Sequence, residues 1–116
     1  MTQTGKQRPC EEGCPFRIVQ DRLGDKWSVL IILILDEAES IRFSDLHNRI
    51  DGISLKVLSS CLRNLERDNL IVRTSYDEVP PRVEYALSVL GKDLVPYIKK
   101  LSEWAMENLS WNGIRQ

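Results

Sequence analysis

The sequence predicts a mainly α-helical domain that carries one small β-hairpin. Apolar residues recur at helical spacing over most of the chain, two short runs alternate with a period of two, and a proline-containing turn joins those runs. A chain of 116 residues can bury one modest core but not two. We therefore expect a single domain over residues 14–116, preceded by a flexible polar arm over residues 1–13.

The composition excludes several classes of protein. It is 42% hydrophobic and 28% charged, as in ordinary globular proteins. The net charge is -1, so a nucleic-acid-binding surface would have to be a local patch. The longest apolar run, Val29 to Leu35, is too short to cross a bilayer and no cleavage site precedes it, so we expect a cytoplasmic protein. The odd number of cysteines, 3, also favours a reducing compartment.

Two helices are expected in the first third of the chain. Pro15 suits the first turn of a helix that continues to Leu23 and stops at Gly24. The next run, residues 27–35, is apolar on all sides, so its periodicity fits a buried helix or a buried strand. We predict a helix, because Asp25 can cap it and the polar residues that follow offer no partner strand.

A helix-turn-helix pattern follows. Apolar residues recur at helical spacing from Phe43 to Ile50 and stop at the turn dipeptide Asp51-Gly52. A second helix then begins at Ser54, a suitable capping residue. Its apolar residues form one stripe, which should be buried: Leu58, Cys61, Leu62 and Leu65. Two short helices joined by a glycine-containing turn are typical of this motif.

A β-hairpin is expected next, with an arginine at its tip. Alternating residues should give each strand one apolar face: Leu70, Val72 and Thr74 in the first, and Val83, Tyr85 and Leu87 in the second. Pro80 and Pro81 fix the backbone of the turn, so Arg82 would project from a stiff support and suit contact with a phosphate backbone. In the alternative interpretation the prolines only end a strand and Arg82 is solvated.

The order of these elements is that of a winged helix-turn-helix DNA-binding protein. Opposite the leucine stripe, the second helix of the motif carries only hydrogen-bond donors, which suit base edges in a major groove. The predicted base-reading residues are Ser54, Lys56, Ser59, Ser60 and Arg63, and the predicted backbone contacts are Arg67, Arg82, Lys26 and Arg42. A solvated helix face is the alternative, and Lys26 could instead lay its stem on the indole of Trp27.

A long amphipathic helix over about residues 90–111 should end the chain. Its apolar face is broad and aromatic, and a small domain has little spare core to cover it, so we expect a partner subunit. The predicted interface residues are Leu94, Tyr97, Ile98, Leu101, Trp104 and Ala105.

Other reactive residues give weaker signals. Cys14 stands at a predicted helix N-terminus, where the helix dipole favours a thiolate that could sense oxidants, although it could equally be inert. Cys61 should be buried and unreactive, and His47 has no second ligand in register. No metal site, cofactor motif or catalytic constellation is present, so an enzyme is not expected. A thiol-based enzyme and a protein-binding winged helix are the competing classes.

The sequence resembles the HxlR-type family of transcriptional regulators, relatives of the MarR winged-helix group. The resemblance covers about residues 14–104. It is carried by Cys14-Pro15, by residues 23–27 (LGDKW), by residues 42–46 (RFSDL) leading to 52–54 (GIS), and by residues 78–85 (EVPPRVEY) followed by Leu90-Gly91. Asp25 stands where family sequences often have a glycine.

The resemblance implies a homodimer joined through its terminal helices, with each recognition helix in a major groove and each wing on the neighbouring backbone or minor groove. It also implies that Cys14 is the position through which some members respond to thiol-reactive compounds. We therefore predict a repressor that binds a pseudo-palindromic double-stranded operator, with half-sites about 34 Å apart or a multiple of that. The effector, the operator sequence and the regulated genes are not predicted.

Overall fold

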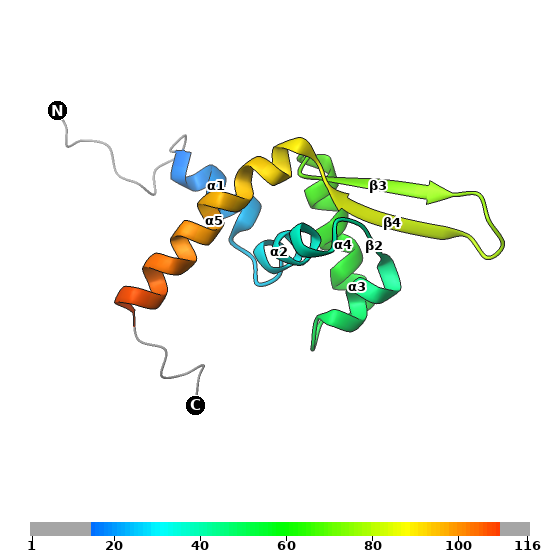
Figure 1. Cartoon of the computed structure of the whole chain (residues 1–116), viewed down its shortest axis with the longest axis horizontal. Helices are drawn as coiled ribbons and strands as arrows, with labels where there is room; N and C mark the ends of the chain where they lie inside the picture. Colours follow the sequence, from blue (N-terminus) through cyan, green and yellow to red (C-terminus); the bar gives the residue numbers. More distant parts are fainter. Residues whose placement is uncertain (1–14, 110–116) are drawn as a thin grey trace.

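The computed structural model describes residues 15–109, and these residues form a mainly helical domain with one small sheet (Figure 1). This confirms the predicted fold class. The elements in chain order are α1 (Pro15–Leu23), α2 (Ser28–Ala38), β2 (Ile41–Arg42), α3 (Phe43–Arg49), α4 (Leu55–Arg67), β3 (Ile71–Tyr76), β4 (Arg82–Leu87) and α5 (Val89–Asn108). The predictions for the arm at residues 1–13 and for Cys14 lie outside the described residues.

Helix α2 forms the centre of the core, as the apolar run predicted. Ile31, Ile32 and Leu35 are almost completely buried. Asp25 caps the helix: its Oδ2 accepts hydrogen bonds from the backbone N–H groups of Trp27 and Ser28, each at 3.1 Å. Asp25 thus serves the start of the helix, although the N-cap residue itself is Trp27. Across residues 15–109, no helix combines the length and the apolar character that crossing a membrane requires.

Helices α3 and α4 form the helix-turn-helix. Gly52 lies in the turn with a φ of 85°, a left-handed conformation that glycine adopts without steric cost. Ser54 caps α4, because its Oγ accepts a hydrogen bond from Val57 N–H at 3.1 Å. His47 Nε2 lies 2.9 Å from the carbonyl oxygen of Ile53. A carbonyl can only accept, so this ring nitrogen carries the proton, and the bond ties the end of α3 across the turn.

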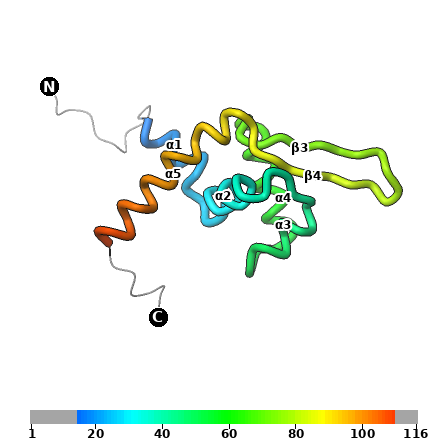
Figure 2. The backbone as a smooth tube through the Cα atoms, in the orientation of Figure 1, coloured from blue at the N-terminus to red at the C-terminus, as the bar shows by residue number. Residues whose placement is uncertain are grey.

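The sheet is antiparallel with the strand order β2-β4-β3. Strands β3 and β4 form the wing (residues 71–87), which extends away from the helices in the tube view of Figure 2. The sequence did not predict β2, whose Ile41 pairs with Tyr85 of β4. A strand of two residues is too short to show any periodicity, so only its partner identifies it.

The apolar face predicted for the first hairpin strand is wrong by one residue. Ile71 is 3% exposed and Val72 is 47% exposed, so the buried position falls on Ile71. Ile71 lies opposite Leu87 in the register, and the two side chains share one face of the sheet. Leu70 precedes the strand, and its N–H bonds to Leu65 at the end of α4. The face predicted for β4 is confirmed, since Tyr85 and Leu87 are buried.

Helix α5 begins two residues before Gly91. Ser88 caps it by accepting a hydrogen bond from Gly91 N–H at 2.9 Å, and the Ser88 hydroxyl donates to Asn69 O at 2.6 Å. A Cβ atom at Gly91 would collide with the carbonyl oxygen of Leu70. Glycine therefore lets α5 approach the start of the wing closely, and Val95 and Ile98 complete the core.

Candidate nucleic-acid interface

The outward face of α4 presents the predicted donors to solvent. Lys56, Arg63 and Arg67 are exposed, and Ser59 and Ser60 are half-buried beside them. Within residues 15–109, none of these three cations forms an ion pair. Ser54 is exposed at the start of the same helix, although its oxygen already accepts the capping bond. The leucine stripe of α4 faces the core. The opposite face, which carries these donors, is therefore available to a partner.

Asn64 is a residue that the sequence reasoning did not select. It is exposed on α4, one turn after Ser60. Its amide can donate and accept toward an adenine edge, as asparagine does in major grooves. Its spacing of four residues from Ser60 is the signal in the sequence that places it beside the predicted base-reading residues.

An open groove lies between the wing and the helix-turn-helix. It has a volume of about 610 Å³. One wall is made by Arg42, Phe43 and Ser44 at the start of α3 together with Ser59 of α4, and the other by the wing. The wing residues that line it are Arg73, Glu78, Pro80, Pro81, Arg82, Val83 and Tyr85. We call this space the wing groove.

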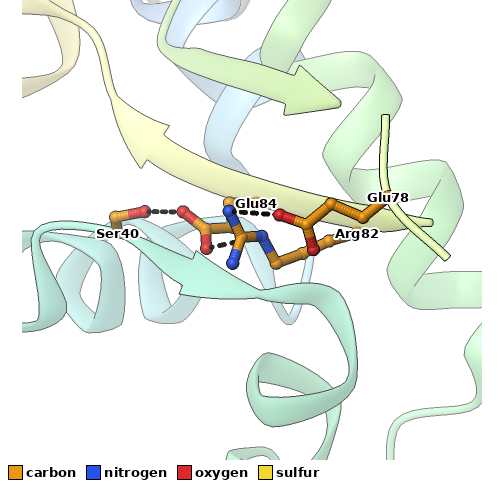
Figure 3. Close-up of polar contacts among 4 residues, drawn as sticks. All are labelled: Ser40, Glu78, Arg82 and Glu84. Carbon is orange, nitrogen blue, oxygen red and sulfur yellow. Dashed lines mark hydrogen bonds and ion pairs between the residues drawn. The ribbon is translucent and has the colours of Figure 1, made fainter. Parts of the chain in front are cut away.

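Arg82 lies inside a cluster of polar side chains instead of projecting from the hairpin tip (Figure 3). Its Nη2 is 3.2 Å from Glu78 Oε2, and its Nε is 3.4 Å from Glu84 Oε2. The Nε atom is shielded from solvent and is close enough to Glu84 for an ion pair, but it is not aligned for a hydrogen bond. The guanidinium also lies 4.0 Å from the centre of the Tyr76 ring.

Glu84 extends this cluster to the neighbouring strand. Its second oxygen, Oε1, accepts a hydrogen bond from Ser40 Oγ at 2.8 Å (Figure 3). Ser40 directly precedes β2, so the cluster connects the tip of the wing to the chain that enters α3. We refer to Ser40, Glu78, Arg82 and Glu84 as the Arg82 cluster. Only 25% of the Arg82 side chain is exposed, which is unlike the free cation that the sequence predicted.

The other predicted backbone contacts differ in their surroundings. Lys26 places its Nζ 4.9 Å from the centre of the Trp27 ring, as in the alternative interpretation of this residue. Arg42 is exposed at the entry to α3. Arg73, which the sequence reasoning missed, is exposed on β3. It was missed because the prediction placed Val72 and Thr74 on the face toward the helices, whereas that face carries Ile71 and Arg73.

Cys61 of α4 lies next to Asp25, which is in the segment between α1 and α2. Cys61 Sγ is 3.7 Å from Asp25 Oδ2. Burial, the nearby Asp25 charge and this contact together raise the pKa of the Cys61 thiol to about 11. Burial alone would raise the pKa of Asp25, but hydrogen bonds from Ser28 and from the Trp27 backbone lower it below its ordinary value. Cys61 is half-buried instead of buried, and it stays a thiol.

The predicted interface residues of α5 divide into two groups. Tyr97, Leu101 and Trp104 are exposed, Tyr97 at 73%, so they are available to a partner. Ile98 is 8% exposed and belongs to the core of its own chain, which corrects the prediction for that residue. Leu94 packs against the same core, and Ala105 is half-buried. Helix α1 adds further exposed apolar side chains at Phe16, Ile18 and Val19.

No group of three or more histidine, cysteine or acidic side chains within residues 15–109 could hold a metal ion.

Comparison with known proteins identifies relatives over most of the chain. The model of the HxlR-like helix-turn-helix family matches residues 22–112. The HTH-type transcriptional regulator BH0655 of Halalkalibacterium halodurans is 42% identical over 94 residues, which are 81% of this chain and 83% of the relative. The HTH-type transcriptional regulator YtfH of Escherichia coli is 37% identical over 115 residues, covering 94% and 90% of the two chains.

Solved structures show the same fold. A MarR-family transcriptional regulator from Porphyromonas gingivalis superimposes with a TM-score of 0.78 at 39% identity, covering 89% of this chain and 100% of the other. The transcriptional regulator YodB of Bacillus subtilis in its reduced form superimposes with a TM-score of 0.75 at 29% identity, covering 85% of this chain and 97% of the other. The redox regulator HypR in its reduced form superimposes with a TM-score of 0.75 at 31% identity, covering 81% of this chain and 92% of the other.

Proposed function

Because the chain belongs to the HxlR-like helix-turn-helix family of transcriptional regulators and not to an enzyme family, we propose that it acts as a homodimeric repressor on a double-stranded operator. Helix α4 enters the major groove of each half-site. A cytoplasmic location is part of this proposal.

The outward face of α4 is the observation that supports this proposal best. Lys56, Arg63 and Arg67 are exposed there and unpaired within residues 15–109. Arginine and lysine donate to guanine O6 and N7, and the serines between them can bond to either partner of a base pair. We assign base reading to Ser54, Lys56, Ser59, Ser60 and Arg63. Arg67, with Arg42 and Lys26, is assigned to the backbone.

A second copy of the chain is the proposed partner for the apolar surface of α5. Tyr97, Leu101 and Trp104 lie outside the core of their own chain. A two-fold dimer would place two recognition helices on half-sites about 34 Å apart, or a multiple of that distance.

Binding to the DNA upstream of the protein's own gene tests the proposal. Fluorescence anisotropy should show nanomolar binding to an operator fragment and binding at least 10³-fold weaker to a scrambled fragment. Arg63→Gln should reduce the discrimination between the two fragments, because a good bidentate contact to a base is worth about 1–3 kcal/mol. Lys92→Gln, which removes a charge from the exposed start of α5, is the control. Absence of binding to either fragment would favour the competing function, a winged-helix module that binds protein and not DNA.

Redox control through Cys14 is a second candidate function. Cys14 lies outside the described residues, and the support comes from the similarity to HypR and YodB. HypR is described in reduced and oxidised forms and YodB in reduced and diamide-treated forms. Diamide should release the wild-type protein from its operator and leave the Cys14→Ser variant bound. Release of both proteins to the same extent would exclude this function for Cys14.

A further inference from the structure

We propose that Leu55 and Val57, in the first turn of α4, contact the methyl groups of thymine bases in the operator. This inference deepens the proposed function and rests on it, because it names two further specificity-determining residues on the helix assigned to base reading. Both residues are apolar, whereas the residues already assigned there are polar. The operator should therefore present thymines to the start of α4.

Leu55 and Val57 are exposed although α4 has a well-filled apolar face. Leu55 is 57% exposed and Val57 is 40% exposed. The leucines that α4 contributes to the core come later in the helix and are at most 1% exposed: Leu58, Leu62 and Leu65. Successive residues of a helix are rotated by about 100°, so Leu55 and Val57 lie on either side of the exposed Lys56. The apolar surface of the first turn is thus uncovered in the single chain and lies beside a cation.

The backbone that carries these two side chains is fixed at its start. Ser54 Oγ accepts a hydrogen bond from Val57 N–H at 3.1 Å. Ile53 is buried, and its carbonyl oxygen accepts a hydrogen bond from His47 Nε2 of α3 at 2.9 Å. Contact with a methyl group needs such a fixed position, because a gap of about 0.5–1 Å already loses a quarter to a half of the dispersion attraction.

Thymine is the base that an apolar side chain can identify in a major groove. Its C5 methyl group lies at the surface of the groove, next to the O4 acceptor. The polar side chains assigned to base reading bond to oxygen and nitrogen atoms, so they do not detect this methyl group. Side chains of a helix lean toward its N-terminus, and the N-terminal residues of a recognition helix are those that reach base edges. The first turn of α4 is therefore the part of the helix suited to methyl contacts.

The charges beside the two residues favour DNA as the partner of this apolar surface. Lys56 and Arg63 are exposed and, within residues 15–109, form no ion pair. A major groove combines anionic phosphate walls with methyl groups on its floor, so it matches both the cations and the apolar side chains. A purely apolar partner would leave both cations without a counter-charge.

Removal of single methyl groups from the operator tests the inference. Deoxyuridine pairs with adenine as thymidine does and lacks only the C5 methyl group. Fragments in which one thymine is replaced in both half-sites therefore isolate the contribution of each methyl group. Burial of one methyl group is worth about fourfold in affinity, so replacement of a contacted thymine in both half-sites should weaken wild-type binding about fifteenfold in fluorescence anisotropy.

Alanine variants identify which side chain contacts each methyl group. Leu55→Ala should abolish the effect of uracil at one contacted position and Val57→Ala at another, as in a double-mutant cycle. Both side chains are exposed, so the melting temperature should not change. Val89→Ala is the matched control, because Val89 is the first residue of α5, as Leu55 is of α4, and is 86% exposed. This control should keep every uracil effect.

Three results would contradict the assignment. If no uracil replacement changed wild-type affinity, or if every uracil effect persisted in both alanine variants, the inference would be overturned while the proposed function stands. If only one variant kept every uracil effect, its residue would be excluded as a methyl contact. A wild-type protein that binds operator and scrambled DNA equally would overturn both the inference and the proposed function.

Discussion

Glu84 connects three parts of the molecule through one side chain. One of its oxygens accepts the hydroxyl of Ser40 at the entry to β2, and the other lies beside Arg82 at the start of β4. Arg82 in turn lies over Tyr76 of β3. Only 22% of the Glu84 side chain is exposed, so these interactions are less weakened by solvent than those of a surface ion pair. Glu84 therefore acts as a polar link between the wing and the chain segment that leads into α3.

Removal of this link should destabilise the domain. Glu84→Ala leaves the shielded Nε of Arg82 without its carboxylate and Ser40 without an acceptor, and we expect a loss of about 1–3 kcal/mol in the free energy of unfolding. Urea denaturation followed by circular dichroism measures it. Glu37→Ala, an exposed acidic residue on α2, should change stability by less than about 0.5 kcal/mol. An equal effect of the two substitutions would contradict the role given to Glu84.

Cys61 should react slowly with thiol reagents below its raised pKa. At pH 8 the folded protein holds it as a thiol, because burial and Asp25 raise its pKa to about 11. Alkylation by iodoacetamide, followed by peptide mapping, should therefore accelerate between pH 8 and 11 in the folded protein. In the urea-unfolded protein the alkylation rate of Cys61 should instead rise around the ordinary cysteine pKa of about 8.5. Identical profiles in both conditions would contradict the raised pKa.

The same shift has a defined sign in the stability of the protein. A raised folded pKa means that the folded state binds the thiol proton more tightly than the unfolded chain does. The corresponding stability is fully present below about pH 8.5 and is lost as the pH rises toward 11.

Among the elements, those with local signals could be predicted and those with distant partners could not. The caps Asp25 and Ser54 and the Asp51-Gly52 turn act within a few residues, so the sequence located α2, α3 and α4. Strand β2 exists only through its pairing with β4, more than forty positions along the chain, and the phase of β3 is set by Leu87. The Arg82 cluster was missed for the same reason, because Ser40 and Glu84 are distant in sequence.

Alanine substitutions at Gly52 and Gly91 should destabilise the protein by different amounts. Gly52→Ala meets no nearby atom and is opposed only by the φ of 85°, so it should cost about 1–2 kcal/mol. Gly91→Ala meets the Leu70 carbonyl and must move α5 away from the wing, so it should cost more, about 2–4 kcal/mol. Thermal denaturation compares the two variants. A smaller effect at Gly91 than at Gly52 would show that α5 is not held as closely as described.

At the scale of the whole molecule, the wing and the C-terminal half of α5 extend in opposite directions from the helical body (Figure 2). The proposed DNA-binding and dimer surfaces are thus separated. The sequence predicted the apolar surface of α5 but not its division, because Ile98 and Leu101 look alike in the pattern and only one of them packs on the core. Periodicity identifies an apolar stripe, and the tertiary fold decides which of its residues remain exposed.

Substitution of an exposed residue on this surface should separate the two subunits without unfolding them. Leu101→Asp places a charge at a position that is 67% exposed in the single chain, so the fold should be retained while the dimer dissociates. Light scattering after size-exclusion chromatography should show a dimer for the wild type and a monomer for the variant. Lys92→Asp on the same helix is the control, and it should remain dimeric. A monomeric wild type would contradict the proposed dimer.

The pairing of β2 with β4 has a consequence for the proposed binding of DNA. β2 leads directly into α3, and the Ser40–Glu84 bond fastens the same point to the wing. These interactions therefore hold the wing and the helix-turn-helix at a fixed distance from one another. When the groove width of a duplex differs from that spacing, the duplex has to deform. If the protein binds an operator as proposed, operators with easily deformed pyrimidine–purine steps at that distance should be bound more tightly than stiff ones, even at base pairs that no side chain touches.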